Sequence, residues 1–269
     1  MKPFFSIVTV SYNQSTYLRQ CIESVLSQDF RDFEYIIQDP GSTDDSRQII
    51  ASYGKGIDLV LFAPDNGPAD GLNQAFSRAN GRYYMFINSD DLLNPYALSR
   101  IHAWIQRDKM SHAVYSGGSY IINSAGKRLR RAYSDCASLR RMAYGQSILM
   151  QPSSAISAPS FHSVGGFNSN NKSNWDGELF IDLALKRYSF ANSRQIFSSY
   201  RLHSKSITGS GCLHKQHLQY QSRMYTKITG RPYATQSVVL KALYWAERKV
   251  LNPCDTFERL VHGPVYRQS

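Results

Sequence analysis

The chain has 269 residues, of which 42% are hydrophobic, so it can bury a substantial core and is not globally disordered. Its net charge is +11, and the positive charge is concentrated in two regions. Residues 201–269 contain 11 Lys/Arg and 3 Asp/Glu, and residues 127–141 contain six Lys/Arg and one Asp. This distribution predicts an anionic partner, such as anionic membrane lipid or a phosphorylated acceptor, although solvated surface charge explains any single residue equally well. Nucleic acid is not expected, because no recognition motif for it is present.

In chain order, the first half alternates strand and helix patterns. Strands are expected at 5–10, 33–38, 58–62 and 83–87, and helices at 16–28, 43–53 and 68–79. Ser15 is a candidate N-cap for the first helix, and Thr43 or Asp44 for the second. This rhythm predicts parallel βαβ units with covering helices, which is an α/β fold.

The pattern changes after residue 110. The second half predicts a hairpin over 113–122 and 127–133, an extended segment at 147–158, a helix at 176–188, a strand at 195–202, and helices near 213–228 and 236–251. The last helix carries an apolar stripe of Val239, Leu243, Ala246 and Val250, which is more typical of a packing face than of a membrane anchor.

The cysteines and the N-terminus indicate a compartment. Cys21, Cys136, Cys212 and Cys254 lack metal-finger spacing and are expected to be reduced thiols. The first apolar run is too short for a signal peptide, and no segment reaches the length of a membrane span. We therefore expect a cytoplasmic protein, with peripheral binding to the inner membrane through its basic C-terminal region as a further expectation.

The most informative stretch is the apolar run from residue 83, which ends in the adjacent carboxylates Asp90 and Asp91. In open α/β sheets, ligands bind at the carboxyl ends of the strands. Because two neighbouring carboxylates repel each other, a divalent metal that bridges to a diphosphate would stabilise them. Alternatively, Asp91 caps the following helix.

Three more polar segments follow predicted strands or precede a helix, at 11–13, 39–44 and 64–73. Each alone could be an ordinary turn. In a doubly wound sheet, however, these segments gather at one edge together with 88–91, so the set predicts a ligand site there.

With these motifs, residues 4–210 resemble the family 2 glycosyltransferases, which are inverting enzymes with the GT-A fold. The resemblance rests on Ser6–Asn13, Asp39 with Gly41–Asp44, Asn73, Gly81, Asn88–Asp91, Gly165–Phe167, Asp176–Leu179 and Tyr200–His203. It implies a GT-A catalytic domain over 1–210, with a nucleotide-binding half (1–110) and an acceptor half (111–210), followed by a basic helical extension (211–269). Residues 64–67 with Asp70 and Asn73 are similar to a bacterial branch that builds surface polysaccharides such as O-antigen or capsule.

The resemblance also implies donor-binding roles. The donor would be a nucleotide diphosphate sugar, with a UDP-sugar expected because a carboxylate at Asp39 can accept the uracil imide N–H. Asp91 matches the residue that binds Mn²⁺ or Mg²⁺, and Asp90 matches a contact to the ribose or the metal. His203 matches a loop histidine near the metal, although a surface histidine without a role fits as well. The implied nucleotide contacts are Val10, Ser11, Tyr12, Asn13, Asp39, Gly41, Asp70, Asn73, Ser89 and Asp90.

Inversion needs a carboxylate that takes the proton of the acceptor hydroxyl. The resemblance places this base at Asp176, with Glu178 as the second candidate; a structural alternative makes Asp176 an N-cap and Glu178 a partner of the helix dipole. The chain departs from the family pattern at Pro40, Asn88 and Glu178, where acids or a shorter acid are usual.

The expected function is metal-dependent transfer of a sugar to a hydroxyl of a saccharide or lipid-linked saccharide. Two alternatives stay open: a nucleotidyltransferase, which would need a glycine-rich phosphate loop after the first strand, and a non-catalytic nucleic-acid-binding module that uses the basic, tyrosine-rich surface.

Overall fold

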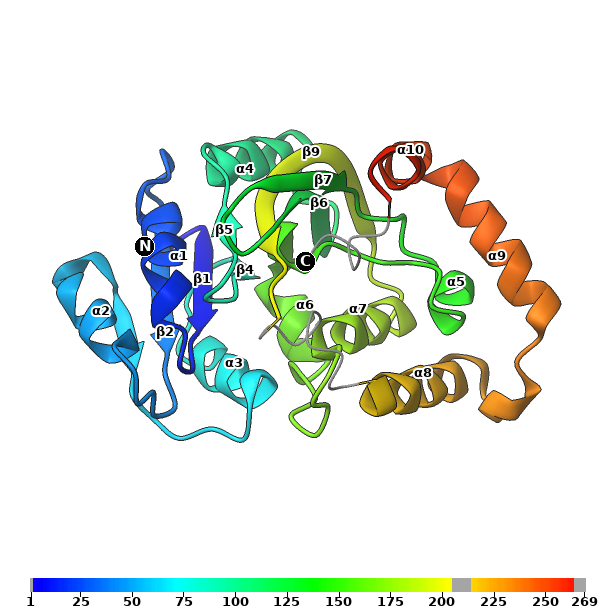
Figure 1. The fold of residues 1–269 in the computed structure, drawn as a ribbon, viewed down its shortest axis with the longest axis horizontal. Coiled ribbons are helices and arrows are strands. Elements are labelled where there is room, and N and C mark those ends of the chain that lie inside the picture. Colours follow the sequence, from blue (N-terminus) through cyan, green and yellow to red (C-terminus); the bar gives the residue numbers. More distant parts are fainter. Residues whose placement is uncertain (1, 205–213, 264–269) are drawn as a thin grey trace.

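The structure is a computed structural model and describes residues 2–204 and 214–263 (Figure 1). It contains a nine-stranded sheet in the order β3-β2-β1-β4-β8-β6-β9-β5, with β7 paired to β6. The strands are β1 (Phe5–Val10), β2 (Phe33–Gln38), β3 (Leu59–Leu61), β4 (Tyr83–Phe86), β5 (Leu92–Leu93), β6 (Val114–Ile122), β7 (Arg128–Ala132), β8 (Ser154–Ser157) and β9 (Phe190–Arg201). The helices are α1 (Ser15–Leu26), α2 (Ser46–Ser52), α3 (Pro68–Phe76), α4 (Ala97–Arg107), α5 (Leu139–Ala143), α6 (Ala158–Ser163), α7 (Trp175–Leu185), α8 (His214–Thr229), α9 (Val238–Leu251) and α10 (Pro253–His262).

Helices cover both faces of the sheet and create two cores. Phe5 and Ile7 of β1 point into one core, with apolar side chains of α1, α2 and α4. Val8, which follows Ile7, points into the other core, with side chains of α3, α6 and α7. This is the alternation expected for a strand buried on both faces.

The first half confirms the predicted βαβ rhythm. Strands β1, β2, β3 and β4 pair in parallel, and each lies within one residue of its predicted bounds. The predicted caps were wrong in detail, because Ser15 is the first residue of α1 and α2 begins only at Ser46. Asp44 serves both helices: its carboxylate accepts hydrogen bonds from the backbone N–H of Ser15 (2.9 Å) and of Ser46 (3.0 Å).

The second half makes the sheet mixed. The β6–β7 hairpin is confirmed, β8 pairs antiparallel with both β4 and β6, and β9 pairs in parallel with β6. Two predicted segments differ. Strand β9 begins at Phe190, five residues before the expected strand, because the polar run 192–195 does not have the apolar pattern of a strand. Only Ser154–Ser157 of the expected extended segment 147–158 forms a strand.

The described residues of the C-terminal region form three α-helices, α8, α9 and α10, rather than the expected two. Helix α10 follows α9 directly: Asn252 accepts a hydrogen bond from the N–H of Asp255 (3.3 Å), and Pro253 occupies the first turn, which are typical start signals. The expected packing face of α9 is exposed instead, at 68% for Val239, 57% for Leu243 and 77% for Val250. No helix of the described ranges is long and apolar enough to span a membrane.

The C-terminal helices lie along the side of the molecule farthest from α1 and α2 (Figure 1). Helix α8 contacts α5 and α7, and α10 contacts β7. Cys21, Cys136 and Cys254 are free thiols, while Cys212 lies outside the described residues.

Candidate functional site

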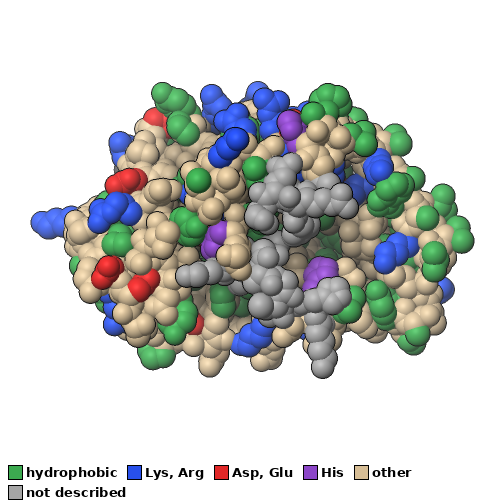
Figure 2. All heavy atoms as spheres, viewed as in Figure 1, with side chains coloured by type: hydrophobic (Ala, Val, Ile, Leu, Met, Phe, Trp, Pro, Cys, Tyr) green, Lys and Arg blue, Asp and Glu red, His purple; other side chains and the backbone are tan. Residues whose placement is uncertain are grey.

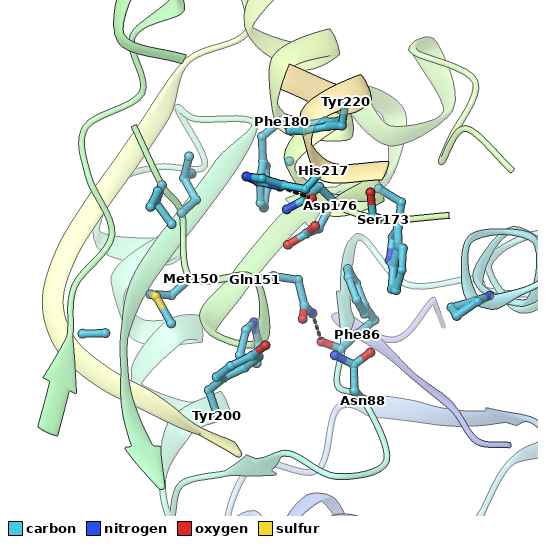
Figure 3. Close-up of a pocket in the computed structure, with 18 of the residues that line it drawn as sticks. Phe86, Asn88, Met150, Gln151, Ser173, Asp176, Phe180, Tyr200, His217 and Tyr220 are labelled. Atoms are coloured by element: carbon cyan, nitrogen blue, oxygen red, sulfur yellow. Dashed lines mark hydrogen bonds between the residues drawn. The ribbon is translucent and has the colours of Figure 1, made fainter. Parts of the chain in front are cut away.

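A cavity of about 1480 Å³ runs from the carboxyl ends of β1, β2 and β4 to the C-terminal helices (Figure 3). This volume exceeds that of a typical single-ligand pocket, so two substrates can occupy it together. Seven of the predicted site residues line it: Val10, Ser11, Tyr12, Gly41, Ser89, Asp90 and Asp176. The expected gathering of the strand-end segments at one edge is therefore found.

Asp39 lies just beneath this end of the cavity and is fully buried. Its Oδ1 accepts hydrogen bonds from the backbone N–H of Gly41 (3.0 Å) and Ser42 (2.8 Å) and from Arg47 Nε (3.1 Å). Its Oδ2 is buried without a partner among the described residues, as are Ser11 Oγ and Gln38 Oε1. Because an unpaired buried polar atom costs about 1–3 kcal/mol, these three atoms indicate a place where a ligand's polar groups complete the hydrogen bonding.

Asn13 joins two of the polar segments but does not itself line the cavity. Its N–H donates to Ser42 Oγ (2.9 Å), and its Oδ1 accepts from the N–H of Thr43 (2.8 Å). Its backbone is left-handed (φ 53°), a conformation that Asn tolerates better than most residues. Asn13 thus fixes the 11–13 segment against 39–44.

Asp70 and Asn73 do not line the cavity, in contrast to their expected roles at the nucleotide. Asp70 Oδ2 accepts hydrogen bonds from the N–H of Asn66 (2.9 Å) and from Gln74 Nε2 (3.3 Å), so it closes its own turn. The amide of Asn73 is bonded at both ends to the backbone of Phe167, at 2.8 and 2.9 Å. Both side chains are therefore occupied by structural contacts.

Asp65 from the same loop lines the cavity instead. Its Oδ1 accepts a hydrogen bond from the N–H of Gly67 (2.9 Å), and burial raises the pKa of its carboxyl group. A Cβ at Gly71 would lie 2.5 Å from Asp65 Oδ2. The absence of a side chain at residue 71 therefore allows α3 to approach this carboxylate closely.

The acidic pair after β4 splits into two environments. Asp90 lines the cavity, and its Oδ2 lies 3.0 Å from His203 Nε2. Asp91 is 1% exposed and does not line the cavity; its Oδ1 accepts the backbone N–H of Arg201 (2.8 Å) and its Oδ2 lies 3.4 Å from Asn88 Nδ2. Burial, followed by the charge of Asp90, raises the pKa of Asp91 well above its usual value. The geometry thus favours Asp90 over Asp91 as the cavity-facing acid, the reverse of the expected order.

Arg201 holds this region together. Its fully buried guanidinium donates to the carbonyl of Asp90 (2.8 Å) and of Ser124 (3.1 Å) and to Gln20 Oε1 (2.9 Å), and it lies over the ring of Tyr17. The end of β9 is thereby tied to the acidic segment, to α1 and to the β6–β7 turn.

The residues present suit a divalent cation. Asp90 Oδ2 and His203 Nε2 lie 3.0 Å apart, so one oxygen and one nitrogen donor are adjacent, although His203 itself does not line the cavity. An imidazole nitrogen suits a transition metal better than Mg²⁺, which prefers oxygen ligands. The described residues contain no group of three or more His, Cys, Asp or Glu that could hold a metal by itself. A cation at this point would thus need further ligands from a substrate.

Asp176 lies in the first turn of α7 and lines the cavity. The N-cap position belongs to Asn174, whose backbone is left-handed (φ 54°), so the alternative of Asp176 as N-cap is not supported. Burial raises the pKa of the Asp176 carboxyl group, which keeps its proton affinity above that of an ordinary aspartate.

Helix α8 covers Asp176 with two aromatic side chains (Figure 3). A Cβ at Gly177 would lie 2.6 Å from Tyr220 Oη, so Tyr220 packs directly on the α7 backbone. Burial and the charge of Asp176 raise the pKa of Tyr220. His217 stacks near Tyr220, and its Nδ1 lies 2.9 Å from Asn174 Oδ1.

Glu178, the second candidate base, faces away from this cavity and does not line it. Its carboxylate accepts hydrogen bonds from Asn168 Nδ2 (3.1 Å), Asn171 Nδ2 (2.8 Å) and Arg223 Nη2 (2.7 Å), with Lys227 Nζ at 3.5 Å. Burial alone would raise the pKa of Glu178, but the bonds from Asn168 and the charge of Arg223 lower it. Glu178 therefore anchors α8 to α7.

Sequence reasoning missed two polar groups beside Asp176. Ser173 and Trp175 line the cavity and are 4% and 7% exposed, and both Ser173 Oγ and Trp175 Nε1 are buried without a hydrogen-bond partner among the described residues. Both residues lie next to Asp176 in the family motif, and this position was the signal that could have identified them.

The comparisons with known proteins agree with this geometry. The family model described as glycosyl transferase family 2 matches residues 6–165. The putative teichuronic acid biosynthesis glycosyltransferase TuaG of Bacillus subtilis is 41% identical over 93 residues, which cover 34% of this chain and 37% of TuaG. The chondroitin synthase of Pasteurella multocida is 27% identical over 184 residues, 68% of this chain and 19% of that protein. The chain thus spans well under half the length of these relatives.

Solved structures share the fold. S. aureus TarS (1–349), solved in complex with UDP-GlcNAc, superposes with a TM-score of 0.61 at 21% identity, covering 96% of this chain and 74% of that one. The mannosyltransferase PcManGT of Pyrobaculum calidifontis, solved with GDP-Man and Mn²⁺, superposes with a TM-score of 0.62 at 15% identity, covering 97% and 75%. The predicted α/β GT-A fold is confirmed.

Proposed function

Because the chain belongs to glycosyltransferase family 2, we propose that it moves a sugar from a nucleotide diphosphate sugar, a UDP-sugar, to a hydroxyl of a saccharide acceptor in the assembly of a bacterial surface polysaccharide. One observation carries the proposal: an unpaired carboxylate oxygen at Asp39, the Asp90–His203 pair and the Asp176 carboxyl group lie in or against one cavity. The relative named for teichuronic acid biosynthesis and the UDP-GlcNAc complex of TarS support this substrate class.

At the nucleotide end, Asp39 Oδ2 accepts the imide N–H of uracil, while Oδ1 stays bonded to the backbone of Gly41 and Ser42. Ser11 and Gln38 supply further polar atoms for the base and ribose. A cytosine ring offers no N–H at the imide position, so this arrangement discriminates between the two pyrimidines.

At the diphosphate, Asp90 and His203 would hold Mn²⁺, whose chemistry when bound is to offset the negative charge on the departing UDP. The PcManGT complex, solved with Mn²⁺, supports a metal in this fold. Arg201 and Asp91 act behind this pair, because they fix the position of the Asp90 backbone.

Asp176 is the general base. Its carboxylate takes the proton of the acceptor hydroxyl as that oxygen attacks the anomeric carbon, and the bond from the anomeric carbon to the diphosphate oxygen breaks on the opposite face. Burial raises the pKa of the Asp176 carboxyl group, which makes its carboxylate a stronger base than that of an ordinary aspartate. Ser173 Oγ and Trp175 Nε1 hydrogen-bond the sugar beside it.

The C-terminal helices would place the enzyme at the cytoplasmic face of the inner membrane, near a lipid-linked acceptor. The exposed apolar side chains of α9 and α10, which Figure 2 shows along one edge among Lys and Arg, include Val239, Leu243, Val250, Phe257 and Leu260. Lys249 Nζ lies 3.5 Å from the centre of the Trp245 ring, a cation and an aromatic group together, as in helices that lie in the membrane interface.

The membrane contact can be tested with vesicles. The chain should float with vesicles that contain anionic lipid at low salt, and Leu243→Glu with Val250→Glu should abolish flotation. Arg194→Gln, an exposed change on β9, serves as the control. If the wild-type chain stays in solution, or if the double variant only converts a dimer to a monomer, the face does not bind membrane.

The function itself is tested with a panel of nucleotide sugars. We expect one UDP-sugar to raise the melting temperature in the presence of Mn²⁺, because ligand that binds only the folded state stabilises it. Release of UDP from that donor should require Asp176 when acceptor is present. Nucleotide triphosphate turnover without sugar transfer would instead favour a nucleotidyltransferase.

A further inference from the structure

The end of the cavity formed by β7, α9 and α10 is lined by three arginines around one carboxylate, which we call the arginine cluster: Arg130, Arg248, Arg259 and Asp255. Arg259 Nε lies 2.6 Å from Asp255 Oδ2, Arg130 Nη1 lies 3.4 Å from Oδ1, and Arg248 Nη2 lies 3.5 Å from Oδ2. One buried carboxylate is therefore shared by three guanidinium groups.

Positive charge exceeds negative charge at this end. Lys241 also lines the cavity here, so four cations face one carboxylate. Two acids lie behind the cluster: Asp135 accepts from Arg248 Nε (2.8 Å), and Glu258 accepts the backbone N–H of Arg131 (2.8 Å). They reduce the excess without removing it.

One of the arginines also has an unused donor. Arg130 is 7% exposed, and its Nε is buried without a hydrogen-bond partner among the described residues. Burial and, after it, the charge of the neighbouring Arg259 lower the pKa of Arg130. Planar guanidinium groups with free N–H donors match the oxygens of a phosphate group.

The cavity is electrically divided. Three of the four acids that line it, Asp65, Asp90 and Asp176, lie at or near the strand ends and α7. The fourth, Asp255, belongs to the arginine cluster, which β7, α9 and α10 form. A donor diphosphate belongs at the acidic end, together with a cation. The basic end suits a second anionic group that enters the same cavity from another molecule.

We propose that the arginine cluster binds a phosphate group of the acceptor. This inference rests on the proposed function, since it takes the cavity to hold donor and acceptor together. It assigns the acceptor to the phosphate-bearing saccharides, either lipid-linked through a phosphate or phosphorylated on the chain, and it gives α9 and α10 a role in substrate recognition.

Inorganic phosphate is the direct probe of this site, and it is titrated into the protein at constant ionic strength. EDTA is present, so that phosphate cannot bind at Asp90 through a metal ion. We expect saturable binding to the wild-type chain, weakened at least fivefold in both Arg259→Gln and Lys241→Gln. Lys241 takes no part in the ion pairs of the arginine cluster, so Lys241→Gln tests the contribution of positive charge to phosphate binding without loosening α10. Arg194→Gln, an exposed arginine outside the cavity, should bind phosphate like the wild type.

A second arm compares one saccharide acceptor with and without a terminal phosphate. Arg259→Gln should raise KM for the phosphorylated acceptor and leave KM for the neutral one unchanged. Equal phosphate affinity in all variants, binding too weak to saturate, or equal changes for both acceptors would show that the arginines only hold α10 on β7. Stabilisation of the protein by a UDP-sugar is measured separately. Binding of phosphate without binding of any UDP-sugar would contradict the proposed function, whereas binding of a UDP-sugar without binding of phosphate would contradict the phosphate site.

Discussion

Asp90 and His203 lie 113 residues apart in the chain, yet Asp90 Oδ2 is 3.0 Å from His203 Nε2 at the cavity wall. Asp91, the next residue, points away from the cavity to the backbone of Arg201. The two adjacent acids thus lie in different places, Asp90 at the cavity and Asp91 against the end of β9.

The first prediction separates these two acids. Asp90→Asn should abolish the Mn²⁺-dependent part of the stabilisation by UDP and lower kcat by about 10²–10³-fold, because the charge opposite the cation is lost. Asp91→Asn keeps an oxygen for the Arg201 N–H and should retain most of the metal-dependent stabilisation. Melting curves with UDP, with and without Mn²⁺, measure both. If Asp91→Asn alone loses the metal effect, the original order of the two ligands is right.

The second prediction concerns pH. In the proposed mechanism, transfer requires Asp176 without its proton, and burial raises the pKa of this group above the usual value for aspartate. The rate should therefore rise with pH through this elevated pKa and fall in acid earlier than an ordinary aspartate would cause. A pH profile of kcat/KM measures it, and Asp176→Asn should lose transfer while still binding UDP. A profile that is flat down to pH 4 would contradict this role.

The third prediction concerns Glu178 as an anchor. Glu178→Gln removes the charge that pairs with Arg223 and Lys227, so the free energy of unfolding should fall by about 1–3 kcal/mol at pH 7. Because the folded-state pKa of Glu178 is lowered, its stabilisation is present above the unfolded pKa and is lost as pH falls through the folded value. The difference between wild type and variant, measured by urea unfolding, should shrink below about pH 4. A large loss of kcat without loss of stability would instead restore Glu178 as a base.

The fourth prediction concerns the sugar contact. Trp175→Phe keeps an aromatic ring in the core but removes the unpaired indole N–H, so it should weaken UDP-sugar binding by about two- to tenfold, the value of one hydrogen bond. Binding of UDP alone should not change. Trp104→Phe, which alters a ring packed between Tyr115 and Phe197, is the matched control. Equal losses for UDP and UDP-sugar would mean that Trp175 only supports the fold.

Local sequence patterns and motifs were sufficient to predict much of the fold. The βαβ rhythm placed β1 to β4 within one residue, since strands buried on both faces appear as continuous apolar runs. The same reasoning brought the 11–13, 39–44 and 88–91 segments to one edge. It could not tell Asp90 from Asp91, because the direction of each side chain after a strand ends depends on a loop conformation set by Arg201, far along the chain.

Other features depended on contacts that spacing does not reveal. Asn73 and Asp70 carry motif positions, but their hydrogen bonds to Phe167 and Asn66 occupy them. The apolar stripe of α9 has the pattern of a buried face, and pattern alone cannot say whether a protein interior or another surface covers it. The arginine cluster joins residues of β7, α9 and α10, so it could be found only once these three elements were placed together.

Gly177, in the first turn of α7, lies directly against Tyr220 of α8. A Cβ at this position would lie 2.6 Å from Tyr220 Oη, so even a methyl group would displace the Tyr220 side chain. Gly177 and Tyr220 both line the cavity, so a larger residue at position 177 would reshape it beside Asp176 without altering the groups proposed to react. Under the proposed function, the choice of residue at this one position would influence which acceptors fit.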